Sequence, residues 1–77
     1  MNIQIHSTTA TKEFNGVTCR VWEGITEGGV EVYCLIPRIA HKDNEPEEKV
    51  QQFRDELTEV ADPSPDAVRC FSLRQII

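Results

Sequence analysis

Apolar and polar residues alternate along the N-terminal half of the chain, a pattern typical of β-strands that bury one face. Ile3 and Ile5 alternate with polar neighbours, and strand-like sequence continues to Phe14. Asn15-Gly16 then interrupts the pattern with two residues that tolerate the positive φ of a type I′ hairpin turn. We therefore predict an antiparallel hairpin whose first strand ends at Phe14 and whose second covers residues 17 to about 25.

The second predicted strand has two faces of different composition, because successive side chains of a strand point to opposite sides. One face is apolar, whereas the other is polar apart from an aromatic residue at its end. The apolar face holds Val17, Cys19 and Val21, and the opposite face holds Thr18, Arg20 and Trp22. We expect Trp22 to lie on the face of the sheet away from the helix predicted below.

A third strand is predicted over residues 30–36, after a turn at Thr26-Glu27-Gly28-Gly29 whose glycines permit unusual backbone dihedral angles. The strand is apolar on both faces, with Tyr33 and Leu35 on one of them, which indicates a central position in the sheet. Pro37 cannot donate a hydrogen bond to a neighbouring strand, so we expect pairing to end there on one side.

The longest helical pattern covers Asn44 to Asp62, where apolar residues recur at steps of three and four and so share one side of a helix. These residues are Val50, Phe53, Leu57, Val60 and Ala61. Asn44 is expected to cap the helix and Pro46 suits its first turn, whereas Pro63 cannot continue it. A stripe of this kind predicts a helix that packs on a sheet.

Residues 68–77 predict one further strand. The fold class that follows is α+β: an antiparallel three- to four-stranded sheet with one helix packed on one face, in the order β-β-β-α-β. A chain of 77 residues is expected to form a single domain, 1–77, with a thin core, because chains near this length bury only about 60% of their extended surface.

The sheet face without a helix is a candidate surface for self-association. If Trp22, Tyr33, Leu35 and Phe71 gather there, they form an apolar patch that requires a partner, and a second copy of the chain would supply one. A small structural or assembly protein that forms a homodimer is therefore the alternative functional hypothesis.

Charge is distributed unevenly along the chain, whose net charge is −5. Residues 43–66 hold nine acidic and two basic residues, so they carry −7 and the rest of the chain carries +2. This asymmetry argues against nucleic acid as the direct ligand, because phosphates are contacted by Lys and Arg. It favours a basic protein partner.

Several features predict a location in the cytoplasm, with no membrane association. No apolar run approaches the roughly 20 residues of a membrane-spanning helix. The N-terminal stretch MNIQIHSTT lacks the basic and apolar regions of a signal peptide. Three cysteines are a poor disulfide framework and suit a reducing compartment.

The sequence predicts a protein that is not an enzyme and holds neither cofactor nor metal. The cysteines and histidines show no closely spaced ligand pair, and the three cysteines are more simply small core residues. Adjacent carboxylates such as Glu47-Glu48 diverge by about 100° on a helix, so they do not converge on one site. The glycines do not match the pattern of a phosphate-binding loop. The negative net charge disfavours binding of single-stranded nucleic acid. The residues that could otherwise contact such a strand are Trp22, Arg20, Arg38, Arg69 and Arg74.

The acidic side of the predicted helix is the main candidate for a binding site. Glu48, Asp55 and Asp62 would recur about every 10 Å along one side. A row of carboxylates can occupy a basic groove that otherwise holds a nucleic-acid backbone, so mimicry of DNA charge is the functional hypothesis. The simpler interpretation is a solvated surface that keeps a small domain soluble. The expected partner-binding residues are Glu45, Glu48, Asp55, Glu56, Glu59 and Asp62.

A resemblance gives this hypothesis a biological setting. The segment Val21-Trp22-Glu23-Gly24-Ile25-Thr26-Glu27-Gly28-Gly29-Val30, followed by an acidic helix with Phe53-Arg54-Asp55-Glu56-Leu57, resembles small proteins of phages and mobile elements, including anti-CRISPR inhibitors. The resemblance covers the middle of the chain and carries no catalytic motif. It implies an inhibitor in the host bacterial cytoplasm that blocks a basic nucleic-acid-binding host protein, such as a CRISPR effector subunit.

Overall fold

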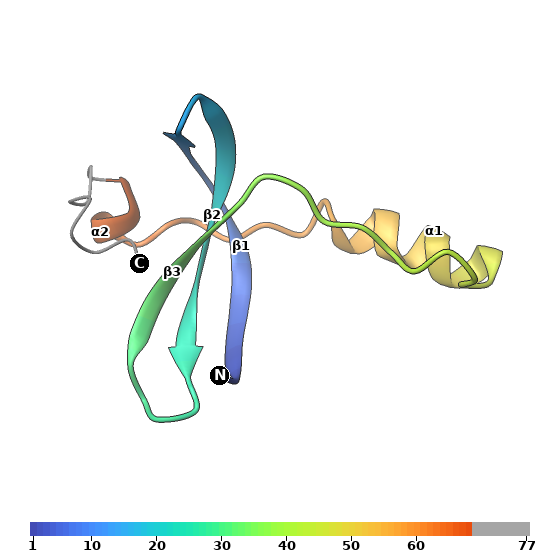
Figure 1. The fold of residues 1–77 in the computed structure, drawn as a ribbon, viewed down its shortest axis with the longest axis horizontal. Coiled ribbons are helices and arrows are strands. Elements are labelled where there is room, and N and C mark those ends of the chain that lie inside the picture. Colours follow the sequence, from blue (N-terminus) through green and yellow to red (C-terminus); the bar gives the residue numbers. More distant parts are fainter. Residues whose placement is uncertain (69–77) are drawn as a thin grey trace.

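The chain forms a three-stranded antiparallel sheet followed by two helices in the computed structural model, which describes residues 1–68. The strands are β1 (Ile3–Phe14), β2 (Val17–Thr26) and β3 (Glu31–Ile36), in the order β1-β2-β3 (Figure 1). The helices are α1 (Glu47–Glu56) and the short α2 (Pro65–Val68). The predicted α+β class and the order of three strands followed by a helix are confirmed. In the described sheet β2 is the central strand and β3 lies at the edge, which corrects the central position expected for residues 30–36.

Both predicted turns are present. Asn15 and Gly16 have φ values of 51° and 79°, as a type I′ turn requires, and the register places Phe14 opposite Val17. At the second turn Gly29 has a φ of 87°, and the backbone N–H of Thr26 donates to the carbonyl of Val30 at 2.9 Å. Local sequence therefore determines how the three strands are connected.

The pairing of β1 with β2 contains a bulge. Ser7 pairs with Trp22 and Thr11 pairs with Arg20, so three residues of β1 lie opposite the single residue Val21 of β2. Extra residues of this kind interrupt the ladder of hydrogen bonds and increase the local twist of a sheet.

Side chains replace the hydrogen bonds that the bulge removes. Thr8 is completely buried; its hydroxyl donates to the carbonyl oxygen of Val21 at 2.6 Å and accepts from the N–H of Ala10 at 3.2 Å. Arg20 Nη1 donates to the carbonyl oxygen of Thr8 at 2.7 Å. The carbonyl oxygens of Val21 and Thr8 and the N–H of Ala10 thus have hydrogen-bond partners, as buried polar groups generally must.

The core lies on the Val21 face of the sheet. Cys19 and Val21, both on this face of β2, are 4% and 0% exposed, and Ala67 of α2 is 6% exposed. Glu23, on the same face, accepts hydrogen bonds from the backbone N–H and the hydroxyl of Ser64. These bonds attach the segment leading into α2 to the middle of the sheet, and the predicted facing of Cys19 and Val21 is confirmed.

Helix α1 differs from its prediction in both length and packing. It begins at Glu47 and ends at Glu56, rather than covering residues 44–62, and none of its residues is buried. Pro46 occupies the N-cap position and no side chain caps the helix, so the expected cap at Asn44 is absent. Figure 1 shows α1 projecting away from the sheet instead of lying across one of its faces.

The chain after α1 explains why the helix is short. The hydroxyl of Thr58 donates to the carbonyl oxygen of Asp55 at 2.7 Å, a bond that competes with further helical turns. The chain then returns to the free edge of β1. There the N–H of Ala61 donates to the carbonyl oxygen of Ser7 at 2.9 Å, and the N–H of Thr9 donates to the carbonyl oxygen of Ala61 at 3.1 Å. Ala61, expected on the helix stripe, forms an isolated parallel bridge with Thr8 instead.

Most of the last predicted strand lies outside the described residues; its first residue, Val68, ends α2. Across residues 1–68, no helix has both the length and the apolar character needed to cross a membrane.

Candidate functional site

The most exposed element of the fold is a helical arm, which we define as residues 37–57, the linker after β3 together with α1 and its C-cap residue. The linker runs beside the helix, and the ring of His41 meets the ring of Phe53 edge-on, with centroids 5.6 Å apart and planes at 77° (Figure 1). The N–H groups of Lys49 and Val50 donate to the carbonyl oxygen of Pro46 at 2.9 and 3.0 Å. Phe53 is half-buried.

Two of the predicted acidic residues share one side of α1. Glu48 and Asp55 are seven positions apart, and helical periodicity places both opposite the side that holds Val50, Phe53 and Leu57. Both carboxylates are exposed, and Asp55 Oδ1 accepts a hydrogen bond from Gln51 Nε2 at 3.0 Å. The helix thus has an acidic side and an apolar side, as predicted.

The other four predicted acidic residues do not extend this row. Glu45 lies in the linker, where its N–H donates to the carbonyl of Lys42 at 3.4 Å, and Glu56 is the last residue of α1. Glu59 and Asp62 follow the helix, and the backbone of Glu59 accepts a hydrogen bond from the Ser7 hydroxyl at 3.0 Å. The expected single row is therefore wrong beyond the helix, because α1 ends before Glu59, although all four residues are exposed.

The predicted self-association patch is divided between the two sides of the sheet. Trp22 pairs with Cys34, whereas Leu35 pairs with Val21 and Tyr33 pairs with Glu23. Residues paired directly across two strands share a face, so Trp22 lies on the side opposite Tyr33 and Leu35. Phe71, the fourth member, lies outside the described residues. The expected apolar patch is thus absent as a continuous surface.

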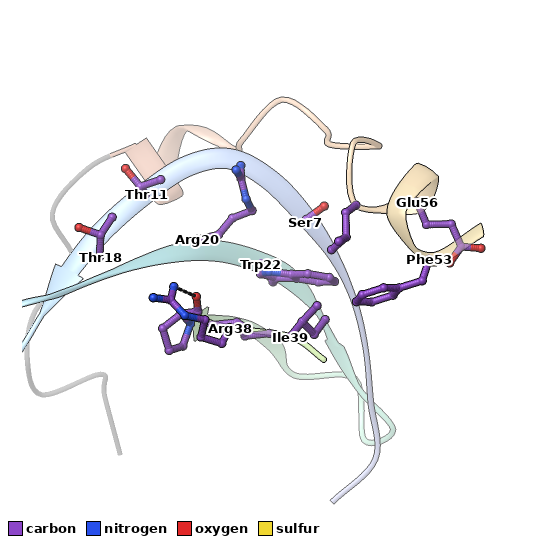
Figure 2. A pocket seen from close by; sticks show the side chains of 12 residues that line it. Ser7, Thr11, Thr18, Arg20, Trp22, Arg38, Ile39, Phe53 and Glu56 are labelled. Carbon is purple, nitrogen blue, oxygen red and sulfur yellow. Dashed lines mark hydrogen bonds between the residues drawn. The ribbon is translucent and has the colours of Figure 1, made fainter. Parts of the chain in front are cut away.

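The Trp22 face holds a cavity of about 380 Å³ at the base of the helical arm (Figure 2). Its apolar lining comes from both parts of the molecule: the sheet, the linker and the last turn of α1. This lining consists of Trp22, Ile36, Pro37, Ile39, Phe53 and Leu57. Trp22 therefore faces the end of α1, which corrects the expectation that it lies on the face away from the helix.

Charged and hydroxyl groups complete the cavity. Arg20 and Arg38 lie toward one end, and Glu56 lies toward the other (Figure 2). Gln52 Nε2 donates to Glu56 Oε1 at 3.2 Å, which fixes this carboxylate on the helix. The sequence pattern had placed Arg20 beside Trp22, but it contained no signal that the linker and α1 would enclose the space above them.

Two of the three cysteines belong to the described part of the chain, Cys19 on β2 and Cys34 on β3. Cys19 is buried and Cys34 is half-buried, both as free thiols, and Cys70 lies outside the described residues. Among residues 1–68, no group of three or more His, Cys, Asp or Glu side chains could hold a metal ion. We take the arm and the cavity at its base as the candidate functional features of the described fold.

Comparison of the chain with protein-family models, with curated proteins and with solved structures finds no match.

Proposed function

We propose that this protein is a non-enzymatic protein-binding inhibitor that docks the acidic side of its helical arm onto a basic surface of another protein. The observation that supports this proposal best is that α1 projects from the sheet without a single buried residue. An isolated helix of fewer than about 12 residues is only marginally stable in water. A partner surface that covers α1 would therefore stabilise the helix.

The charge of the arm determines the chemistry of the partner. Glu48 and Asp55 present two exposed carboxylates on one side of α1. Glu45 adds exposed charge before the helix, and Glu59 adds it just beyond the arm. Charges of this sign are complementary to Lys- and Arg-lined surfaces, which commonly bind nucleic-acid phosphates. We therefore propose a basic nucleic-acid-binding host protein as the partner, with no direct contact to nucleic acid.

The resemblance to small phage proteins extends the proposal to a class of target. In that setting the protein acts in the host bacterial cytoplasm, and the target is a subunit of a defence complex, such as a CRISPR effector. Occupation of its basic surface would exclude DNA or RNA by competition for the same positive charges.

A charge reversal on the arm tests this function. The double variant Glu48→Lys/Asp55→Lys is compared with Glu13→Lys/Glu31→Lys, which changes the net charge equally at exposed residues of the sheet. Each variant serves as bait in a lysate of the host bacterium, and bound proteins are eluted with rising salt and with added DNA.

We expect the wild type and the sheet variant to retain nucleic-acid-binding proteins that salt and DNA both release, because exposed ionic contacts are screened. The arm variant is expected to lose them. Retention of the same proteins by the arm variant, or a loss that is equal for both variants, would contradict the proposed role of the acidic side.

A further inference from the structure

The cavity at the base of the arm combines an aromatic floor with two arginine side chains at one end. It is separate from the acidic side of α1, because Phe53 and Leu57 line it from the opposite side of the helix. Its volume of about 380 Å³ lies within the range of about 300–1,000 Å³ that small-molecule sites occupy. Such sites are lined mainly by apolar and aromatic residues, with a few polar groups that fix the orientation of the ligand.

The apolar part of the cavity suits a flat aromatic ring. Trp22 forms its floor on the sheet, and Phe53 approaches from the last turns of α1 (Figure 2). Ile36 and Ile39 line the cavity from β3 and the linker. Aromatic pairs of this kind stabilise an inserted ring through offset or edge-to-face contacts in addition to the burial of apolar area.

The charged end of the cavity suits an anionic group on that ring. Arg20 is held in place by the hydrogen bond from its Nη1 to the carbonyl oxygen of Thr8 at 2.7 Å, so the bulge in β1 fixes its position. Arg38 Nη1 donates to the carbonyl oxygen of Pro37 at 3.1 Å. A guanidinium has five N–H donors, so both side chains retain donors that a carboxylate can accept in a two-pronged geometry.

Glu56 determines the orientation of such a ligand. Its carboxylate lies toward the end of the cavity opposite the arginines, where it would repel a second negative charge (Figure 2). A ligand with one anionic group therefore has one favourable direction, with the anion at Arg20 and Arg38 and the ring between Trp22 and Phe53.

We propose that this cavity is a binding site for a small aromatic carboxylate or a similar aromatic anion. The ligand contacts both the sheet and the arm, so its binding restrains α1 relative to Trp22. This site does not depend on the proposed docking of the acidic side, which faces away from the cavity.

Naphthalene-2-carboxylate is the probe, and naphthalene-2-carboxamide is its neutral control of nearly the same shape. Binding is measured by calorimetry and by the shift of the indole N–H signal in nitrogen-15-labelled protein, which is unambiguous because the chain has 1 Trp. Arg38→Gln removes one guanidinium of the site. Arg54→Gln removes the same charge from an exposed position on α1 outside the cavity lining.

We expect the carboxylate to shift the Trp22 signal saturably and to bind at least about tenfold more tightly than the amide, since ionised hydrogen bonds are roughly twice as strong as neutral ones. Arg38→Gln is expected to weaken carboxylate binding by about tenfold, and Arg54→Gln to leave it unchanged. Equal affinity for acid and amide, an unchanged affinity in Arg38→Gln, or no saturable shift of Trp22 would overturn the proposal.

Discussion

Thr8 and Phe53 illustrate how differently the sheet and the helical arm are held together. Thr8 lies at the bulge of β1, is completely buried, and uses its hydroxyl both to donate and to accept hydrogen bonds. Phe53 lies in the middle of the apolar side of α1, is half-buried, and meets the ring of His41 from the adjacent linker. The sheet therefore contains buried residues that its own hydrogen bonds hold in place, whereas α1 projects from it and has no buried residue.

From this contrast we expect stability and binding to depend on different parts of the chain. The hydrogen bonds of the bulge and the buried pair Cys19 and Val21 belong to the sheet, and changes there are expected to affect folding. No residue of α1 is buried, so changes there are expected to affect binding. The following predictions test this separation, from the largest expected effect on stability to the smallest.

The largest effect is expected from Gly24→Ala in β2. A Cβ atom at this position would lie 1.8 Å from the carbonyl oxygen of Gln4, so the two strands must move apart. We expect a loss of about 3 kcal/mol in the free energy of unfolding, at the upper end of overpacking costs. Urea denaturation followed by Trp22 fluorescence measures it.

Gly28→Ala is the matched control for this substitution. A Cβ atom there has Thr26 Oγ1 as its nearest neighbour, at 3.9 Å, so we expect nearly wild-type stability. Equal stability of the two alanine variants would show that β1 and β2 are not packed as closely as the structure indicates.

A smaller effect is expected from Thr8→Val, which keeps the shape of the side chain and removes its hydroxyl. The carbonyl of Val21 and the N–H of Ala10 would each lose a partner, and a buried group without a partner costs about 1–3 kcal/mol. We expect a destabilisation of about 2 kcal/mol in urea denaturation. Thr9→Val, at the exposed neighbouring position, should change stability by less than about 0.5 kcal/mol.

The smallest effect on global stability is expected from Gln52→Gly in α1. Glycine disfavours a helix by about 1 kcal/mol relative to alanine, which is sufficient to unfold a short helix that has no buried residue. Far-ultraviolet circular dichroism should show a loss of helix relative to Gln52→Ala, while the urea midpoint reported by Trp22 stays the same in both variants. A matching fall in the midpoint would indicate that α1 supports the sheet.

The sequence predicted the sheet far better than the arm, because the signals for the sheet are local. Asn15-Gly16 alone determines the first hairpin, and the alternation around Val21 identifies the buried face. The class and the order of the elements followed from these patterns.

The errors concern contacts between residues distant in the sequence. The apolar stripe predicted a helix on a sheet, but periodicity contains no information about which surface will cover it. In the structure the helix ends at Glu56, and Ala61 forms backbone hydrogen bonds with the edge of β1. The bulge at Thr8 was also not predicted. The hydrogen bond between Arg20 and the carbonyl oxygen of Thr8, which depends on that bulge, was therefore not predicted either. The sequence signals in this region were a run of hydroxyl residues at 7–9 and an arginine two positions before the only tryptophan.

Native-state hydrogen exchange of the free protein shows whether α1 is an uncovered helix that is available to a partner. We expect the amides of Phe53 and Asp55 to exchange at least about a hundredfold faster than those of Val21 and Trp22, because local opening of a helix without buried residues requires no unfolding of the sheet. Protection of the α1 amides equal to that of β2 would contradict the claim, since it would show that the helix is already covered and opens only when the whole molecule unfolds.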